Sequence, residues 1–324
     1  MARVVCIGVG TVGCGWATVF ARAGHEVVLY DADADTIAAR ALPRIEATLE
    51  QLGREMPTGE APADIRARIR VAGSLGEALS GAKVVQESVR EDLAIKRALF
   101  GEIGKAAPDD CLLLSSTSAL PGSQFLGDMP HPERALVGHP VNPPSHIPLV
   151  ELCATPLTAP ETVERARRFY TEAGMEPITV NKEIDGFILN RLQYTLVAEA
   201  MHLVGEGYCS AAYIDRVMTS GLALRWASIG PFMTAHLNAH DGFAGFVGQL
   251  EGMMKKMGAD ARTDYDWGPD LVAKINDEMT RRQPVGTIPD AQSWRDRRIL
   301  ATRRLQSGDT APGAKGDGTA PDRG

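Results

Sequence analysis

The sequence lacks the features that mark several large classes of protein. Its 324 residues contain no apolar run approaching the roughly 18 residues that span a bilayer, so we expect no transmembrane segment. Lys and Arg number 34 against 41 Asp and Glu, and a net charge of −7 without any basic block argues against nucleic-acid binding. The five cysteines are scattered and form no C-x-x-C pair, so we expect neither disulfides nor a metal site.

These absences leave a globular enzyme as the expected class. Hydrophobic residues make up 44% and charged residues 23% of the chain, as in folded proteins, and 324 residues are enough for two domains. A strand pattern begins at Arg3, so we expect no signal peptide. Together with the scattered cysteines, this favours a cytoplasmic protein.

The first half of the chain alternates short apolar runs with helical stretches. Residues 3–8, 26–31, 84–87 and 111–115 are apolar runs of strand length, separated by segments of helical pattern. This alternation predicts an α/β fold, with a parallel sheet covered by crossover helices on both faces. Residues 36–72 carry apolar residues at helical spacing, interrupted by prolines and a glycine, which predicts an inserted helical hairpin.

The second half has a different pattern. From residue 184 the strand signal ends, and apolar residues recur at helical spacing over 187–204, 210–218 and 270–282. The last 19 residues contain five glycines, two prolines and almost no large apolar side chain, a composition typical of disordered chain. We therefore predict a first domain over 1–183, an all-helical domain over 184–305 and a disordered tail over 306–324.

A glycine motif joins the first strand to the first helix. Gly8, Gly10 and Gly13 follow the pattern G-x-G-x-x-G. In a dinucleotide site the first glycine permits the tight turn, the second lets the backbone approach a pyrophosphate, and the third lets the helix pack closely on the strand. The free amides near Thr11 and Val12 would then face the phosphates at the positive end of the helix dipole.

An acidic residue completes this motif. Asp31 ends the second strand, eighteen residues beyond the last glycine, where a carboxylate accepts hydrogen bonds from the adenosine ribose. Asp33 and Asp35 add negative charge that would repel a 2′-phosphate, so we predict a Rossmann-type domain that binds NAD rather than NADP. The alternative is an ordinary strand–turn–helix whose glycines serve packing alone.

Polar residues also follow or interrupt later strands. Ser118 follows the run 111–115, at the expected carboxyl edge of the sheet. His139 is flanked by prolines, which predicts a loop position, and Glu151 lies in an otherwise apolar strand. A buried carboxylate is costly unless it is paired, so we expect Glu151 to partner His139.

The order of these motifs resembles the 3-hydroxyacyl-CoA dehydrogenase family. The resemblance extends to about residue 237 and rests on Gly8-x-Gly10-x-x-Gly13, Glu91-Asp92-Leu93-x-x-Lys96, Ser116-Thr117-Ser118, His139-x-x-Asn142-Pro143, Leu149-Val150-Glu151 and Asp185-Gly186-Phe187-Ile188-Leu189-Asn190-Arg191. Within the family, the chain is most similar to the lambda-crystallin and L-gulonate 3-dehydrogenase branch, and the L-carnitine dehydrogenases are close relatives.

The resemblance implies a hydride-transfer reaction and assigns roles to four residues. His139 would act as the general base that removes the proton of a substrate C3 hydroxyl, and Glu151 would stabilise the imidazolium that forms. Ser118 and Asn190 match the family residues that hydrogen-bond the substrate oxygen. Purely structural roles remain open for three of these residues. Ser118 could cap the following helix, and Asn190 and His139 could have structural roles in a helix and in a loop.

The resemblance also implies cofactor contacts from a second segment. Glu91 and Lys96 match positions that line the nicotinamide side of the cofactor. They lie at the start of an expected helix, where a solvated ion pair is the alternative.

The substrate follows less directly. Residues 36–72 contain no lysine for CoA phosphates, and Ser116 replaces the asparagine common in acyl-CoA enzymes of the family. A small L-3-hydroxy acid, L-gulonate above all, is therefore favoured over L-carnitine or 3-hydroxybutyryl-CoA, and Arg225 could clamp its carboxylate or lie in a dimer interface. We expect a homodimer, because a helical domain of about 120 residues leaves apolar helix faces that a second copy would cover. A non-catalytic, NAD-binding, crystallin-like protein is the alternative of another class.

Overall fold

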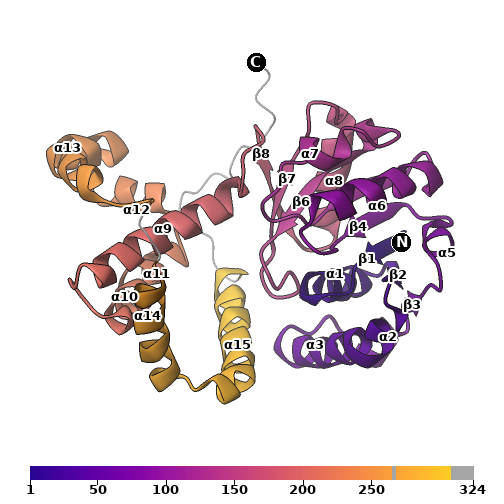
Figure 1. The fold of residues 1–324 in the computed structure, drawn as a ribbon, viewed down its shortest axis with the longest axis horizontal. Coiled ribbons are helices and arrows are strands. Elements are labelled where there is room, and N and C mark those ends of the chain that lie inside the picture. The colour runs from indigo at the N-terminus through magenta and orange to yellow at the C-terminus, as the bar shows by residue number, and fades with distance from the viewer. Residues whose placement is uncertain (265–267, 308–324) are drawn as a thin grey trace. The chain divides into compact units, whose positions relative to one another are not determined.

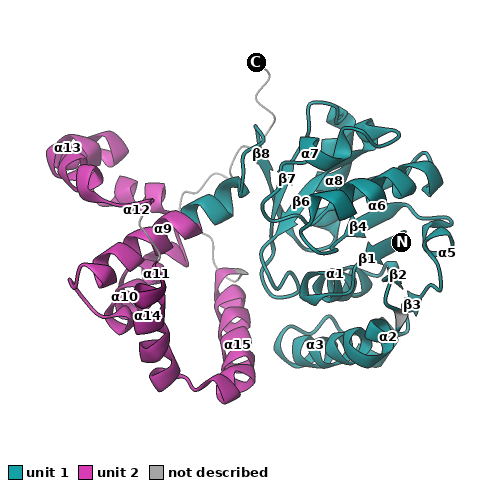
Figure 2. Cartoon of the chain, viewed as in Figure 1, with its two compact units in different colours: residues 1–192 teal, residues 193–324 magenta. Residues whose placement is uncertain are grey.

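The computed structural model describes residues 1–264 and 268–307, and the chain divides into two compact units (Figure 2). The first unit, Met1–Leu192, is built on an eight-stranded sheet of order β3-β2-β1-β4-β5-β6-β7-β8 (Figure 1). All neighbours are parallel except β6 and β7. The strands are β1 (Arg3–Ile7), β2 (Glu26–Tyr30), β3 (Ile69–Val71), β4 (Val84–Glu87), β5 (Leu112–Ser115), β6 (Ala135–Pro140), β7 (Leu149–Cys153) and β8 (Glu176–Val180).

Helices cover both faces of this sheet. Because successive strand residues point to opposite faces, Val4 and Cys6 pack with α1, α3 and α8, whereas Val5 and Ile7 pack with α5, α6 and α7. The helices of this unit are α1 (Thr11–Arg22), α2 (Ala34–Thr36), α3 (Leu42–Glu55), α4 (Pro62–Arg66), α5 (Leu75–Leu79), α6 (Leu93–Ala106), α7 (Ser123–Leu126) and α8 (Pro160–Glu172), with a π-helical turn η1 (Ile37–Ala41) and a 3-10 turn η2 (Pro132–Arg134). The predicted α/β class is confirmed.

The inserted segment departs from its prediction. The expected second helix of the hairpin is only the short α4, and Ile69 lies on the edge strand β3, where it pairs with Val27 of β2. The prediction of helix up to residue 72 was therefore wrong. A strand of three residues is too short for its alternation to be separated from a helical pattern. The edge strand β8 was not predicted either, because four of its five residues are not buried.

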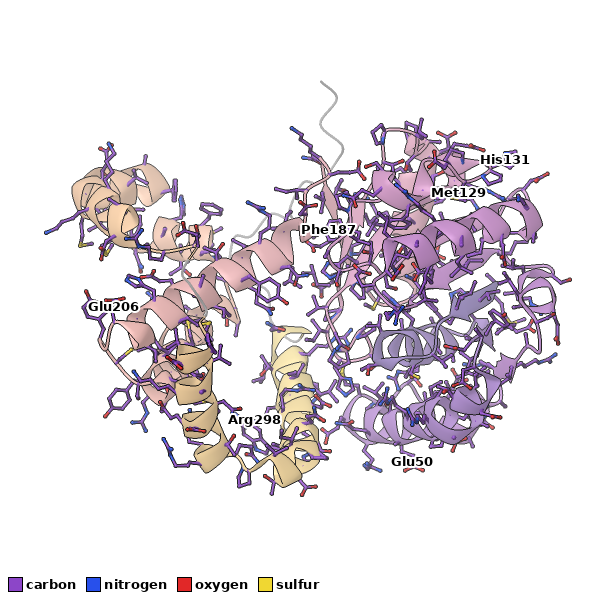
Figure 3. The ribbon with its side chains drawn as sticks, viewed as in Figure 1. Glu50, Met129, His131, Phe187, Glu206 and Arg298 are labelled. Atoms are coloured by element: carbon purple, nitrogen blue, oxygen red, sulfur yellow. The ribbon has the colours of Figure 1, made fainter. Side chains whose placement is uncertain are left out.

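The second unit is helical throughout its described residues. The predicted long helix is α9 (Phe187–Gly205), and the division between the compact units falls inside it, after Leu192. Phe187, at the start of α9 (Figure 3), is fully buried in a cluster that includes residues of α6 and α7. The other helices are α10 (Ala211–Val217), α11 (Ala223–Trp226), α12 (Pro231–Leu237), α13 (Gly242–Asp260), α14 (Pro269–Arg282) and α15 (Ile288–Ser307), with the turns η3 (Met218–Leu222) and η4 (Val285–Thr287).

The described part of the chain ends in the long helix α15. Gln306 and Ser307 belong to α15, and the rest of the predicted tail lies outside the described residues. None of the helices in the described part of the chain has the length and apolar character that a bilayer crossing requires. Among the described residues from 193 onward, the buried apolar side chains are Ala198, Val204, Ala211, Ala235 and Leu300.

Candidate active site

The glycine loop has the geometry that a dinucleotide needs. Gly8 has φ +86°, and a Cβ there would lie 2.7 Å from the backbone of Ser88 at the end of β4. A Cβ on Gly13 would lie 1.9 Å from the carbonyl oxygen of Gly8, so only glycine lets α1 approach β1 this closely. A Cβ on Gly10, by contrast, would meet nothing within 4 Å. The backbone at Gly10 is therefore open to a ligand.

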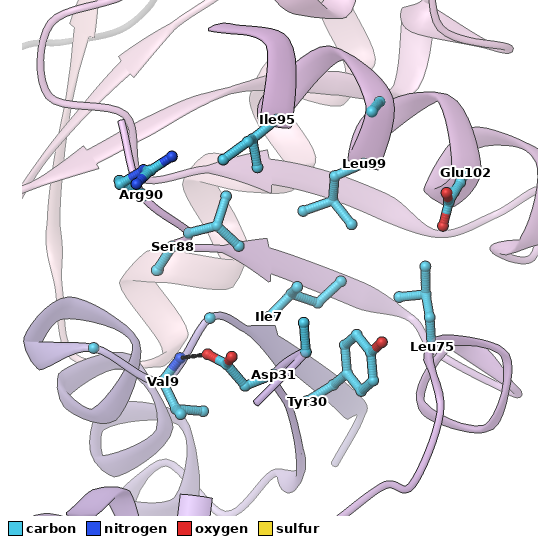
Figure 4. Close-up of a pocket in the computed structure, with 15 residues that line it drawn as sticks. Ile7, Val9, Tyr30, Asp31, Leu75, Ser88, Arg90, Ile95, Leu99 and Glu102 are labelled. Atoms are coloured by element: carbon cyan, nitrogen blue, oxygen red, sulfur yellow. Dashed lines mark hydrogen bonds between the residues drawn. The ribbon is translucent and has the colours of Figure 1, made fainter. Parts of the chain in front are cut away.

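A pocket of about 810 Å³ lies over this loop (Figure 4). Asp31 stands beside the loop, where its Oδ2 accepts a hydrogen bond of 2.9 Å from the Val9 amide. The pocket is lined by Ile7, Gly8, Val9, Gly10, Tyr30, Asp31, Ala32, Leu75, Ser88, Val89, Arg90, Ile95, Ala98, Leu99 and Glu102. Apolar walls for a flat base, a carboxylate for a ribose and open backbone for phosphates fit the adenosine diphosphate part of NAD.

Two further acidic residues, Asp33 and Asp35, were expected to repel a 2′-phosphate at this pocket. Asp33 and Asp35 are exposed and are not among the residues that line it. Hydrogen bonds from Thr36, including one of 2.7 Å from its hydroxyl, lower the pKa of the Asp33 carboxyl. Asp31 is therefore the carboxylate of this acidic group that faces the pocket.

A cation that the sequence did not predict lies beside the loop. Arg44, on α3, donates a hydrogen bond of 3.0 Å from Nη1 to the Thr11 hydroxyl at the start of α1. The first turn of α1 contains no acidic side chain. A guanidinium there adds a positive charge to a helix end that already favours anions. No sequence signal marks Arg44, because 33 residues separate it from Thr11.

The histidine and its predicted carboxylate partner lie side by side on the sheet. His139 is on β6 rather than in a loop, which corrects the expectation from its flanking prolines, and it is the cross-strand neighbour of Glu151 on β7. Nδ1 of His139 lies 2.8 Å from Oε2 of Glu151, and the two side chains are 5% and 1% exposed. The single antiparallel pair in the sheet thus sets the two groups face to face.

The second oxygen of Glu151 is also held. Its Oε1 accepts hydrogen bonds from the amides of Ile188 (2.9 Å) and Leu189 (3.0 Å), in the first turn of α9. The Phe187 ring lies 5.2 Å from the imidazole of His139, centre to centre. Both oxygens of the Glu151 carboxyl are therefore held, one by the histidine and one by the start of α9.

The serine turn and Asn190 are joined through the backbone. Asn190 Nδ2 donates a hydrogen bond of 2.7 Å to the Ser118 carbonyl, and the Gly186 amide donates one of 3.1 Å to the carbonyl of Ala119. Ser118 is exposed and does not cap the following helix, because the N-cap of α7 is Gly122. The structure therefore brings together the two residues predicted to hold the substrate oxygen.

Glu91 and Lys96 do not form a solvated pair. The Lys96 side chain is 1% exposed, and its Nζ lies 2.8 Å from Glu87 Oε1 and 3.3 Å from Glu91 Oε2. Glu87 was not predicted as a site residue, although it ends the apolar strand β4. The rule that singled out Glu151, a carboxylate in an apolar strand, applies equally to Glu87.

Arg225, the predicted carboxylate clamp, lies on α11 of the second unit and is exposed. Its role stays a prediction. It follows the π-helical turn η3, a type of turn that often occurs at functional sites.

The first unit has the fold of dehydrogenases dependent on a nicotinamide dinucleotide, with a glycine loop between β1 and α1, a carboxylate just after β2 and a buried histidine–carboxylate pair. The chain belongs to the 3-hydroxyacyl-CoA dehydrogenase family. Residues 3–184 match the NAD binding domain of 3-hydroxyacyl-CoA dehydrogenase, and residues 186–280 match the C-terminal domain. The predicted family, cofactor NAD and enzyme class, a dehydrogenase acting on CH–OH, are confirmed.

Individual relatives carry different names. The chain is 36% identical over 307 residues to a lambda-crystallin homolog of Rattus norvegicus, covering 94% of this chain and 96% of that protein. It is 41% identical over 244 residues to an L-carnitine dehydrogenase of Streptomyces griseus, covering 74% and 70%.

Solved structures support the same grouping. A 5-formyl-3-hydroxy-2-methylpyridine 4-carboxylic acid 5-dehydrogenase, described as an NAD⁺-dependent dismutase, superposes with TM-score 0.80 at 27% identity, over 96% of this chain and 100% of that chain. The 3-hydroxybutyryl-CoA dehydrogenase of Escherichia coli superposes with TM-score 0.63 at 28% identity, over 78% of this chain and 53% of that chain.

Proposed function

We propose that this protein oxidises the C3 hydroxyl of a small L-3-hydroxy acid, with L-gulonate as the favoured substrate. The observation that carries the proposal is the buried contact of 2.8 Å between His139 and Glu151. A carboxylate on Nδ1 keeps the proton on that nitrogen and leaves the Nε2 lone pair to accept the proton of a substrate hydroxyl. NAD, when bound, accepts the hydride.

The remaining site residues orient the reactants in this proposal. Ser118 and Asn190 hydrogen-bond the substrate oxygen, which places the reacting carbon for transfer. The amides of Gly10, Thr11 and Val12 bind the pyrophosphate, Gly8 and Gly13 permit the tight turn and the close packing of α1, and Asp31 binds the adenosine ribose.

The choice of substrate class rests on charge. A CoA thioester brings several phosphate groups. Residues 36–72 supply no lysine to meet them, and the six arginines of this segment are nearly balanced by five acidic residues. A small free acid brings one carboxylate, which a single guanidinium binds through two parallel hydrogen bonds, and we propose Arg225 for that contact. L-carnitine and 3-hydroxybutyryl-CoA are the alternative substrates, since relatives carry those names.

Steady-state rates on L-gulonate, 3-hydroxybutyrate, L-carnitine and 3-hydroxybutyryl-CoA test the substrate directly. We expect the highest kcat/KM on L-gulonate, and a higher value on L-carnitine or on the CoA thioester would replace it with that compound. Arg225→Ala should raise KM for the free acid, whereas an unchanged KM would assign Arg225 to another role.

The histidine variant tests the mechanism. His139→Gln should lower kcat by about 10²–10⁴-fold, the usual contribution of a general base, with the melting temperature and NADH affinity retained. His240→Gln is a suitable control, because His240 is fully exposed in the second unit. Full activity of His139→Gln would refute the assignment.

A second, non-catalytic function is suggested by the relatives named lambda-crystallin, one of them from Oryctolagus cuniculus. In that case the protein would bind NADH without turning over any 3-hydroxy substrate. Tight NADH binding with no measurable rate on all four substrates would support this reading.

We also propose a cytoplasmic homodimer that buries apolar surface of the helical unit. Large apolar side chains are exposed there, among them Leu224, Trp226, Phe232, Met254, Met257 and Trp294. Patches of this kind on soluble proteins mark interaction surfaces. Sedimentation equilibrium should give twice the chain mass of 34.7 kDa, and a monomer at micromolar concentration would contradict the proposal.

A further inference from the structure

The backbone amides of the turn that carries Ser118 donate hydrogen bonds to the carboxylate of Glu91. Oε1 of Glu91 accepts hydrogen bonds of 3.0 Å from each of the amides of Ser118 and Ala119. It also accepts a hydrogen bond from the Thr117 hydroxyl, whose own oxygen accepts the Leu120 amide at 3.2 Å. One carboxylate oxygen thus collects three donors from three consecutive residues of the turn.

The other oxygen of Glu91 is anchored to a buried cation. Lys96 Nζ lies 3.3 Å from Glu91 Oε2, and it is held from the other side by both oxygens of Glu87, at 2.8 and 3.1 Å. Ser115 donates a hydrogen bond of 2.5 Å to Glu87, and the ammonium lies 5.8 Å from the centre of the Phe125 ring. A buried ammonium with this many partners is set in place, because moving it would leave Glu87 without its counter-charge.

The opposite side of the turn is bound as well. The carbonyl of Ser118 accepts the amide of Asn190, so Glu91 and Asn190 hold the same peptide segment from its donor side and its acceptor side. Ser118 itself is exposed, which leaves its hydroxyl accessible while its backbone is fixed. This is the arrangement expected where a side chain must meet a reactant in a single geometry.

We infer that Glu91 is a positioning residue, which fixes the turn from Thr117 to Ala119 and so holds Ser118 for the substrate oxygen. Lys96, which is itself held by Glu87, holds the Glu91 carboxylate in place. The inference rests on the proposed function, in which Ser118 contacts substrate. It differs from the cofactor contact that the family resemblance implies for Glu91 and Lys96.

The ionisation of Glu91 agrees with this role. Burial acts to raise the pKa of the Glu91 carboxyl, but the hydrogen bonds from Thr117, Ser118 and Ala119 and the charge of Lys96 outweigh burial and lower the pKa overall. The carboxylate is therefore ionised at neutral pH, with Oε1 accepting the hydrogen bonds of the turn and Oε2 paired with Lys96.

Two substitutions at Glu91 separate positioning from cofactor binding. Glu91→Gln keeps an oxygen that can accept the amides of Ser118 and Ala119, whereas Glu91→Ala removes it. A misplacement of about 1 Å costs up to 10²-fold in rate, so we expect kcat to fall about 10²-fold in Glu91→Ala and less than tenfold in Glu91→Gln. NADH affinity should stay within about twofold of the parent protein in both, since no cofactor contact is lost.

The readouts distinguish the other outcomes. A parallel loss of NADH affinity in both variants would make Glu91 a cofactor ligand and overturn the inference. Equal kcat losses in both would also overturn it, because the retained acceptor would then have no effect. Glu164→Ala is the matched control, because Glu164 is an exposed glutamate on α8 that contacts Arg167 at 3.7 Å.

A measurement independent of turnover completes the test. Hydrogen exchange at the amides of Ser118 and Ala119 should accelerate at least about tenfold in Glu91→Ala and remain near the parent rate in Glu91→Gln. Unchanged exchange in Glu91→Ala would refute the inference even in an active enzyme. Absence of turnover in the parent protein with accelerated exchange in Glu91→Ala would refute the proposed function instead.

Discussion

The two compact units of this chain differ in which side chains they bury. In the first, even charged groups are buried, and each has a partner: Lys96 lies against Glu87, and His139 lies against Glu151. In the second, large apolar groups remain exposed, and Phe232 is 75% exposed although most phenylalanines are found inside proteins. The first unit therefore contains its own complete core, and the second leaves apolar surface that another surface can cover.

The cause of the difference is the secondary structure. A sheet covered on both faces buries two layers of side chains, and alternate residues of one strand serve both, as Val4 and Val5 do. A helix buries only one stripe of its surface, whether it has four residues, as α11 does, or 20, as α15 does. Without a sheet, the described part of the second unit buries fewer apolar side chains than the first unit does.

The largest expected effect comes from matched phenylalanine variants in the two units. Phe20 is fully buried and stacks on Trp16 with ring centres 5.2 Å apart. Phe20→Ala should cost about 3–5 kcal/mol in urea unfolding, because it leaves a cavity in the sheet core. Phe232→Ala should stay within about 0.5 kcal/mol in dilute protein. An effect of Phe232→Ala that grows with protein concentration would show that a second copy covers this surface.

Thiol reactivity sharpens the same comparison. Burial raises the pKa of Cys14 to about 11 and that of Cys111 and Cys153 to about 12, and it also raises that of Cys6, whereas Cys209 of the second unit is only partly buried. Because the thiolate is the reactive form, the four thiols of the first unit should react with an aromatic disulfide reagent at pH 8 about a hundredfold slower than Cys209. Two fast thiols in the native protein would contradict a closed sheet core.

A smaller effect should follow from the surface cation of the first unit. Arg44→Ala should weaken NADH and ADP-ribose about tenfold, because one charge-assisted contact near the pyrophosphate is lost. Adenosine, which has no phosphate, should bind equally well to both proteins. Arg54→Ala on the same helix is the control. An equal loss of adenosine affinity would place Arg44 at the ribose or base instead. Calorimetry measures the affinity for all three ligands.

Local sequence pattern was sufficient for much of the site. The glycine spacing, the acid that ends β2 and the carboxylate inside an apolar strand each follow from a rule about a few neighbouring residues, and these rules located Gly10, Asp31 and Glu151. The same rules missed β3 and β8, because short edge strands alternate too briefly or bury too little to give a clear pattern. They also placed His139 in a loop, since its prolines are typical of loops and edges.

The fold class, the cofactor and the family each depend on few residues, so they follow from the sequence alone. Only the folded chain decided which groups meet: Arg44 beside Thr11, Glu91 beneath the Ser118 turn, and Lys96 between two carboxylates. These partners lie between five and 33 residues apart and come from different strands, helices and turns. Their contacts are set by the strand order and by the packing of helices on the sheet, and no local pattern encodes either.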